Sequence, residues 1–277
     1  MKKIDAVFPA AGSLFYTGTS VQLTGKMKKP NAHKEPEFKK NSGHKKLDIL
    51  YEDAYIIVID KPSGMLSVPY PGGSARTAIG VLERIMRDKG TYAKHRKPLA
   101  VHRLDRDTSG VLVLGKHRAA LAGFQALMQS GGVEKRYLCL VDGHWNAAVR
   151  EVRLRLAKGQ LQGGERMVVG AADGQEARTR FRLLQTFADA SLLEATLDTG
   201  RTHQIRVSVQ QRGHGIAGDD KYGKRDFNRA MRKRGYKGMF LHAKSIAFAY
   251  DARPVHVEAP LPDAAAHLIT QLTQESP

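Results

Sequence analysis

The spacing of hydrophobic positions changes several times along this chain, and each change predicts a different element. Alternating or continuous apolar runs predict strands, whereas apolar residues three and four apart predict helices. Strands are expected at 47–51, 55–59, 111–114, 135–141, 150–157, 177–184, 191–198, 239–250 and 254–258. Helices are expected at 77–88, 118–128, 202–211 and 263–272, with turn-rich sequence at 159–174. Strands and helices are interspersed without regular alternation or repeats, which favours an α+β fold with a largely antiparallel sheet.

The first 46 residues lack this pattern. Residues 1–25 hold scattered apolar positions broken by glycine and proline, and residues 26–46 are rich in lysine, proline, histidine and asparagine. The second stretch indicates an extended basic linker. It is either a solvated tether or an arm that contacts a polyanion.

The amino-acid composition limits the class of binding partner. The chain has 277 residues, a formal net charge of +18 and a pI near 10.0, which favour nucleic acid, with an anionic membrane surface as the competitor. No apolar run approaches the roughly 20 residues that span a bilayer, so no membrane partner is expected. The N-terminus lacks the apolar core of a signal peptide, and the single cysteine, Cys139, excludes an intrachain disulfide and a cysteine-based zinc site. A cytoplasmic, RNA-associated protein fits these bounds.

One charged stretch interrupts the apolar pattern, His102 to Gly110, with sequence HRLDRDTSG. It lies between apolar residues 99–101 and the expected strand 111–114. Unpaired charges are expensive next to buried strands, so these carboxylates and arginines are either ion-paired or functional. From composition alone, a solvated loop with ion-paired charges explains the stretch equally well.

The stretch resembles the HRLDxxTSG signature of the RluA-type pseudouridine synthases, which isomerise uridine in structured RNA. Further blocks resemble the family's motifs in the family's order, from DKPSG at 60–64 through KRYLCLVDG at 135–143, RTHQIRV at 201–207, GH at 213–214, GD at 218–219, YG at 222–223 and LHA at 241–243 to APLP at 259–262. The resemblance covers roughly residues 47–272. It implies that residues 47–277 form a catalytic domain with the pseudouridine synthase fold. Many relatives carry a small RNA-binding domain before the catalytic one, but residues 1–46 are short and lack such a domain's pattern, so we expect only an extension and basic linker there.

The resemblance also implies the chemistry. The bond between uracil nitrogen and ribose breaks, the base turns, and a carbon–carbon glycosidic bond forms. No cofactor or metal is expected, in agreement with the lack of a P-loop or dinucleotide fingerprint. Asp105 is the implied catalytic aspartate, acting as nucleophile, base or stabiliser of a cationic sugar. Arg206 is its implied ion-pair partner, and Tyr137 is implied to stack on the base and take part in proton transfer from carbon 5.

Other residues are expected to contact RNA. Uridine must leave its stack to reach a buried aspartate, and Arg103 is implied to fill the vacated space. Leu241 is expected to form part of the apolar wall beside the uracil, and Lys61, Arg201 and His203 are included as substrate contacts. A short basic helix within 224–237, ending at Gly235, is expected to grip phosphates through Arg229, Arg232, Lys233 and Arg234. The side chains of His102, His203 and His242 are expected to make structural hydrogen bonds.

Two other functions remain open, and the sequence departs from the family motifs at three places. A non-catalytic RNA-binding or ribosome-assembly module would not need Asp105, Tyr137 and Arg206 together. A glycosidase would need two carboxylates, but Asp107 falls at a variable motif position. The chain departs from the family at Ser208, Gly215 and 251–254, where histidine, proline and an HPxTG turn are usual. The expected partner is ribosomal or transfer RNA, and the expected state is a monomer.

Overall fold

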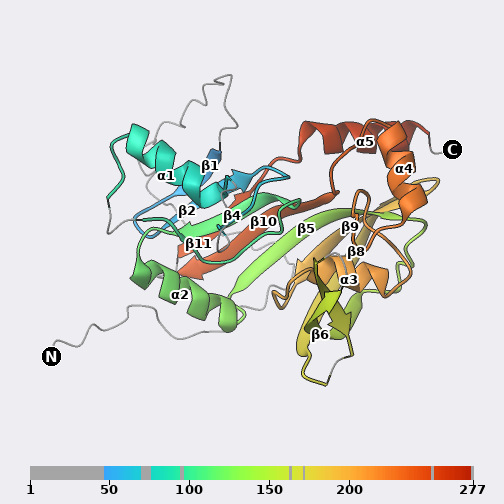
Figure 1. The fold of residues 1–277 in the computed structure, drawn as a ribbon, viewed down its shortest axis with the longest axis horizontal. Coiled ribbons are helices and arrows are strands. Elements are labelled where there is room, and N and C mark those ends of the chain that lie inside the picture. The colour runs from blue at the N-terminus through green and yellow to red at the C-terminus, as the bar shows by residue number, and fades with distance from the viewer. Residues whose placement is uncertain are drawn as a thin grey trace, which may run out of the picture.

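The structure is a computed structural model that describes residues 47–69, 76–93, 97–161, 164–170, 172–250 and 253–275. The extension and basic linker expected at 1–46 lie outside the described residues, as do residues 251 and 252 of the turn at 251–254. The described part forms one large twisted sheet with helices on both faces (Figure 1). The α+β prediction is therefore confirmed.

The sheet has 11 strands. In chain order they are β1 (Asp48–Glu52), β2 (Ile56–Lys61), β3 (Leu99–Ala100), β4 (Ser109–Gly115), β5 (Val133–Asp142), β6 (Glu151–Leu161), β7 (Gly164–Val169), β8 (Gln175–Thr186), β9 (Ala190–Leu197), β10 (Leu241–Tyr250) and β11 (Arg253–Glu258). The main path runs β1-β2-β4-β10-β5-β9-β8-β6-β7, while β3 pairs with β4 and β11 with β10. All pairs are antiparallel except β4 with β10, so the predicted mixed, mostly antiparallel sheet is confirmed.

Helices cover the sheet because each has an apolar stripe. They are α1 (Ala78–Asp88), α2 (Arg118–Gln129), α3 (Gln204–Gln210), α4 (Arg225–Lys233) and α5 (Asp263–Gln274). Apolar residues of α1 and α3 share one core cluster with one face of the sheet. The apolar residues of α2 pack on the opposite face, as do those of α4 and α5 further along the sheet (Figure 1). The face that carries α1 and α3 is the one that holds the candidate site.

The expectation of a turn-rich segment at 159–174 is wrong. β6 and β7 form a long hairpin there, with Leu156 opposite Val169 and Leu161 opposite Gly164. The hairpin lies at the end of the sheet path (Figure 1). Residues 159–166 are rich in glycine and polar residues, so no alternating apolar pattern marks this part of the hairpin.

Three neighbouring strands meet at the middle of the sheet. Gly110 of β4 pairs with Ala243 of β10, and Ala243 pairs in turn with Tyr137 of β5. Gly110 has φ 103°, and a Cβ added there would lie 2.2 Å from the carbonyl oxygen of Ala243. Only glycine allows this approach, which places the loop before β4 next to Tyr137.

We expect Gly110→Ala to lower the free energy of unfolding by about 2–4 kcal/mol, because left-handed strain and overlap with a neighbouring backbone add together. Gly131→Ala is the matched control: Gly131 also has positive φ, 78°, but a Cβ there meets nothing within 4 Å. Urea denaturation of both variants checks this. Equal losses would show that conformational strain alone accounts for the effect.

Candidate active site

The loop that carries Asp105 is clamped by the DKPSG turn through main-chain atoms. The ammonium of Lys61 donates to the carbonyls of Pro62, Met65 and Arg106 at 3.1, 2.7 and 3.0 Å. The N–H of Gly64 donates to the Arg106 carbonyl at 2.9 Å. Two serine hydroxyls complete the clamp. The Ser63 hydroxyl donates to the Asp107 carbonyl at 2.8 Å, and the Ser67 hydroxyl donates to the Leu104 carbonyl at 2.8 Å. The loop backbone is thus fixed without using the Asp105 side chain.

The Asp105 carboxylate has one occupied and one open oxygen. Arg206 Nη1 donates to Oδ2 at 3.0 Å. No hydrogen bond from the described residues reaches Oδ1, and the side chain is 27% exposed. A carboxylate held at one oxygen and open at the other can act on a bound molecule while its orientation stays fixed.

Arg206 is itself locked by a second carboxylate. Its Nε and Nη2 donate to Asp219 at 2.7 and 2.8 Å, a bidentate pair. Asp219 is 1% exposed and also accepts the N–H groups of Lys221 and Tyr222. Burial would raise the pKa of Asp219, but the bonds and charge of Arg206 with these N–H groups outweigh it, so this pKa lies below its ordinary value. Burial would likewise lower the pKa of Arg206, yet both carboxylates raise it, so Arg206 stays charged.

The start of α3 is pinned so that Arg206 points at Asp105. Gln204 accepts from the Thr199 hydroxyl and from the Arg201 N–H at 2.8 and 3.0 Å. Its amide donates to the Arg178 carbonyl and to the Thr179 hydroxyl, both at 3.0 Å. Because these bonds fix α3 against β8, the backbone position of Arg206, two residues after Gln204, is also fixed.

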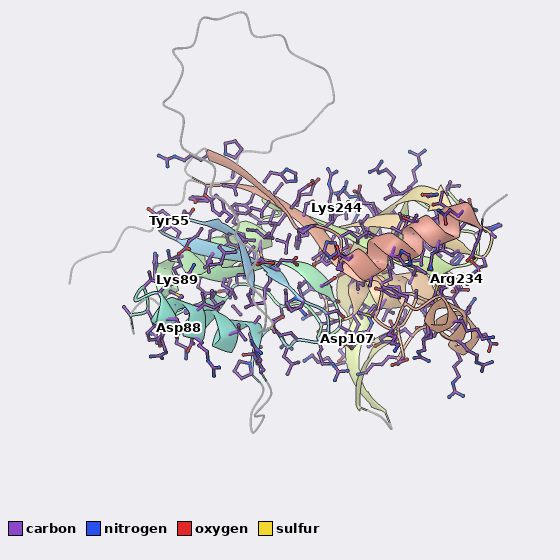
Figure 2. All side chains as sticks on the ribbon, turned by 90° about the horizontal axis from the view of Figure 1, so that it is seen from above. Tyr55, Asp88, Lys89, Asp107, Arg234 and Lys244 are labelled. Atoms are coloured by element: carbon purple, nitrogen blue, oxygen red, sulfur yellow. The ribbon has the colours of Figure 1, made fainter. Side chains whose placement is uncertain are left out.

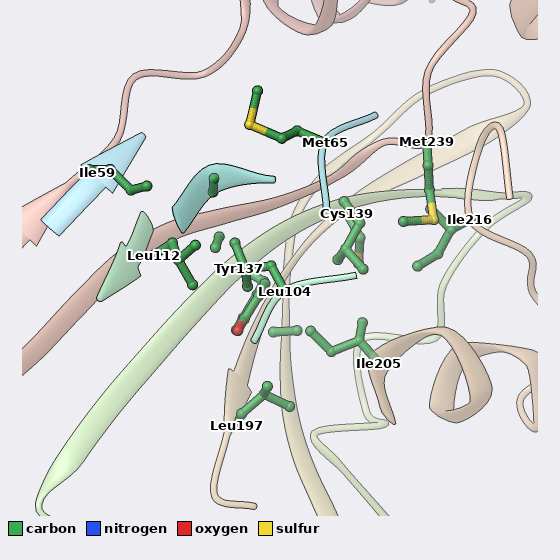
Figure 3. Packing of buried hydrophobic residues seen from close by; sticks show 14 of the residues in the cluster. Ile59, Met65, Leu104, Leu112, Tyr137, Cys139, Leu197, Ile205, Ile216 and Met239 are labelled. Atoms are coloured by element: carbon green, nitrogen blue, oxygen red, sulfur yellow. The ribbon is translucent and has the colours of Figure 1, made fainter. Parts of the chain in front are cut away.

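Tyr137 forms part of the apolar floor beside the aspartate. It is 8% exposed and belongs to the same buried cluster as Leu104, Leu241 and Ile205, and Figure 3 shows it next to Leu104. Burial raises the pKa of Tyr137, and the nearby Asp105 raises it further, so its hydroxyl is protonated at neutral pH. No described residue makes a hydrogen bond with that hydroxyl.

His203 completes the site, whereas two other motif histidines, His102 and His242, have structural roles. The Nε2 of His203 lies 3.8 Å from Asp105 Oδ2. His102 Nε2 accepts the Val113 N–H at 3.1 Å, and burial lowers the pKa of His102 to about 4. His242 joins the Ser109 hydroxyl at 2.9 Å to the Ala259 carbonyl at 3.2 Å. His102 and His242 therefore make the structural hydrogen bonds expected of them, whereas His203 faces the carboxylate.

The side chains of Lys61 and Arg234 are occupied within the fold, which corrects their assignment as RNA contacts. Lys61 is 0% exposed, and its ammonium is occupied by three carbonyls. Arg234 binds Glu275 at 2.7 Å and Asp189 at 3.4 Å and lies beside α5 (Figure 2). Arg201 is exposed, but its Nε donates to the Glu176 carbonyl at 3.1 Å. The side chains of Lys61 and Arg234 hold the fold together, whereas Arg201 stays a predicted RNA contact.

The other expected contacts lie on the surface. Arg103 is exposed, and its guanidinium makes no ion pair with any described residue. On α4, Phe227 and Met231 are buried, while the basic side chains Arg229, Arg232 and Lys233 face outward. Arg229 and Arg232 make only surface ion pairs, at 3.5 and 2.9 Å, with carboxylates that are themselves exposed.

Sequence reasoning missed Asp219, Tyr222 and Asn228 as site residues. The Asn228 amide donates to the Asp219 carbonyl and its oxygen accepts the Gly218 N–H, at 3.0 and 2.8 Å. Asp219 and Tyr222 stand in the GD and YG motifs, which could have marked them, but a buried carboxylate 13 residues from its arginine has no local pattern. Asn228 lies within the basic helix, where nothing distinguishes it from a solvated position.

The departures from the family pattern that can be placed lie away from the carboxylate. Ser208 is buried, with its hydroxyl 3.3 Å from that of Thr179. A Cβ at Gly215 would lie 2.8 Å from the Gly223 backbone, so glycine fits this contact between two loop segments. Among the described residues, no group of three or more histidine, cysteine, aspartate and glutamate side chains could hold a metal ion.

Comparison with known proteins agrees with this geometry. A sequence model of the RNA pseudouridylate synthase family matches residues 55–211. "Ribosomal large subunit pseudouridine synthase C" of Escherichia coli K12 is 40% identical over 230 residues, which cover 81% of this chain and 69% of that protein. Its Salmonella typhimurium counterpart is 41% identical over 222 residues, which cover 78% and 67%.

Solved structures show the same fold. The human RNA pseudouridylate synthase domain containing 4 superposes with a TM-score of 0.66 at 22% identity, over 81% of this chain and 92% of that one. For human RNA pseudouridylate synthase domain containing 1, the TM-score is 0.60 at 23% identity, over 86% and 100%.

The matched residues include the Asp105 loop, Tyr137 and Arg206, and the chain belongs to the RNA pseudouridylate synthase family. It is accordingly an RNA pseudouridine synthase, an isomerase that converts uridine in RNA to pseudouridine.

We expect Asp105→Asn to abolish isomerisation while RNA affinity stays within about threefold, because the amide keeps the shape but supplies no anion. Asp107→Asn is the control, since Asp107 is 44% exposed and paired with Arg106 on the surface. Release of tritium from carbon 5 of labelled uridine measures turnover. Substantial turnover by pure Asp105→Asn would refute the assignment.

We expect Asp219→Asn to lower the free energy of unfolding at pH 7 by about 3–5 kcal/mol, because Arg206 loses a buried anion. The pKa of Asp219 is depressed in the folded state, so its contribution is present above the unfolded pKa of about 4 and is lost as pH falls below it. The difference between wild type and variant should therefore shrink in acid. Urea denaturation at several pH values measures it, with the 80% exposed Asp220→Asn as control; a constant difference would contradict this account.

Proposed function

We propose that this enzyme isomerises a uridine in the ribosomal RNA of the large ribosomal subunit. The observation that carries the choice of RNA is the identity of about 40% to relatives named for that substrate, over 81% of the chain. The outward-facing basic side chains of α4 are compatible with a polyanionic substrate. A transfer RNA substrate, a monomeric state and a cytoplasmic location remain predictions from the sequence. In the described part of the chain, no helix is long and apolar enough to cross a membrane.

The open oxygen of Asp105 is the proposed reacting atom. Oδ2 is held by Arg206 at 3.0 Å, whereas Oδ1 has no partner among the described residues. An anion is suited to attack an electrophilic carbon or to stabilise a cationic sugar. In the overall reaction the bond between nitrogen 1 and the sugar breaks and the bond between carbon 5 and the sugar forms. Carbon 5 loses a proton and nitrogen 1 gains one, so no proton is consumed.

Tyr137 is proposed to handle that proton. Its hydroxyl carries a proton at neutral pH because burial and the Asp105 charge raise its pKa. It can therefore accept the proton from carbon 5 only while giving up its own, which makes it a relay rather than a base that starts ionised. The hydroxyl makes no hydrogen bond with any described residue, so its proton is not committed to another group there.

The walls of the site suit a base that has left its stack. Leu104, Leu241 and Ile205 belong to one buried apolar cluster with Tyr137, which gives a flat ring apolar contacts on several sides. Arg103 is exposed directly before Leu104, and its planar guanidinium is proposed to fill the gap left in the RNA. A binding module without turnover would not require a carboxylate with one locked and one open oxygen.

The substrate is tested by incubating the purified protein with large-subunit ribosomal RNA, small-subunit ribosomal RNA and transfer RNA, each free of pseudouridine. Chemical mapping then identifies any modified position, with Asp105→Asn as the inactive control. Modification confined to a large-subunit uridine supports the proposal. Modification of transfer RNA alone would contradict it while leaving the enzyme class intact.

We expect α4 to bind RNA by its phosphates, so Arg229→Gln with Lys233→Gln should weaken binding to cognate and unrelated RNA alike. Each lost phosphate contact should reduce the slope of log affinity against log salt by roughly 0.7–0.9. The charge-matched control is Arg84→Gln with Lys89→Gln, two exposed positions at α1. Fluorescence binding over a salt series measures both; equal slopes for the two double variants would exclude a specific role for α4.

A further inference from the structure

His203 has a backbone conformation that is unusual for a residue with a side chain. Its φ is 55°, and it is the one residue other than glycine in the described part of the chain with a positive φ. It stands directly before α3 and makes no side-chain capping bond to that helix. Strain of this kind persists where the surrounding structure requires it and tends to occur at functional sites. Capping therefore does not explain the position.

The two ring nitrogens of His203 face different partners. Nδ1 lies 2.9 Å from the hydroxyl oxygen of Tyr222, and Nε2 lies 3.8 Å from Oδ2 of Asp105. The second distance is longer than a direct hydrogen bond but within the range that closure around a substrate shortens. The ring thus links Tyr222 to the carboxylate that Arg206 also holds.

The neighbours of His203 define where its proton resides. The N–H of Met167, in the β6–β7 hairpin, donates to the Tyr222 hydroxyl oxygen at 3.0 Å. The Met167 N–H occupies one acceptor site of the Tyr222 hydroxyl, and when that hydroxyl donates its proton to Nδ1, the ring proton resides on Nε2, facing Asp105. The opposite tautomer would aim a lone pair at the carboxylate.

The ring is neutral in this setting. Burial lowers the pKa of His203, the charges of Arg206 and Lys221 lower it further, and the carboxylates of Asp105 and Asp219 oppose them without reversing the shift. A neutral imidazole has one proton, so the tautomer determines whether Asp105 meets a donor or an acceptor.

We propose that His203 is a positioning residue for Asp105, whose Nε2–H and Arg206 together hold Oδ2 so that Oδ1 faces the substrate. The tautomer is set from the β6–β7 hairpin through Met167 and Tyr222. The inference rests on the proposed role of Asp105, and it assigns the hairpin a defined contact with the active site.

A pair of variants separates this role from a merely structural one. Asparagine places its amide near the Nδ1 position and tolerates the left-handed region better than most residues, whereas glutamine reaches the Nε2 position. If His203 only braces the chain against Tyr222, His203→Asn should be the better enzyme. If it positions Asp105, His203→Gln should keep kcat within about threefold, and His203→Asn should lose between about 10- and 100-fold.

The measurement is the kcat and KM of each variant, with thermal unfolding as a check on folding. We expect the loss in His203→Asn to fall on kcat, with KM nearly unchanged. Equal kcat for the two variants, or a better His203→Asn, overturns the proposal.

A second measurement uses the intact wild-type protein. The nitrogen chemical shifts of His203 in a ¹⁵N-labelled sample report the tautomer directly. Protonation on Nε2 at neutral pH is expected, and Tyr222→Phe should populate both tautomers and lower kcat. Protonation on Nδ1 in the wild type overturns the proposal even if no variant folds. An inactive wild type would instead count against the proposed substrate or chemistry, since the tautomer is read without RNA.

Discussion

Two carboxylates share one buried guanidinium at the centre of this protein, and the rest of the site depends on that arrangement. Asp219 occupies two of the donors of Arg206, and a third reaches Asp105. Taking three charges out of water is costly, and the cost is offset only where the geometry satisfies each of them. The backbone donors on Asp219 and the fixed start of α3 meet that requirement. One oxygen of Asp105 is left without a partner among the described residues, and this oxygen is the proposed reacting atom.

The sheet brings these groups together from distant parts of the chain. The parallel pairing of β4 with β10 allows the Asp105 loop to lie beside Tyr137, and it depends on the missing side chain at Gly110. The 213–223 segment docks on the end of β5, where the Asp142 N–H donates to the Gly215 carbonyl and the Gly215 N–H donates to the Asp142 carboxylate, and this docking delivers Asp219. Each element is ordinary on its own, and the active site arises from where their ends meet.

Much of this architecture could be predicted from the sequence, for physical reasons. Helices such as α1 and strands such as β2 have apolar residues at the spacing of their elements, and the family motifs identified Asp105, Tyr137 and Arg206. The second half of the β6–β7 hairpin was missed because its glycine-rich, polar sequence lacks the apolar alternation that marked the start of β6. Lys61 and Arg234 were assigned to RNA because a basic residue looks the same in a sequence whether its charge meets phosphate, three carbonyls or two carboxylates. Asp219 escaped notice because the partner of a buried charge is defined only in three dimensions.

The clamp on the Asp105 loop has a consequence for how such an enzyme changes its choice of RNA. The bonds from the DKPSG turn end on main-chain atoms, among them the carbonyls of Arg106 and Asp107. The side chains of these two residues point outward, 65% and 44% exposed, and form an ion pair with each other. Every amino acid supplies the same carbonyl, so residues at 106 and 107 can be exchanged without loosening the neighbouring carboxylate. Selection or engineering can therefore vary the rim of the candidate site while the carboxylate that we propose to be catalytic stays in place.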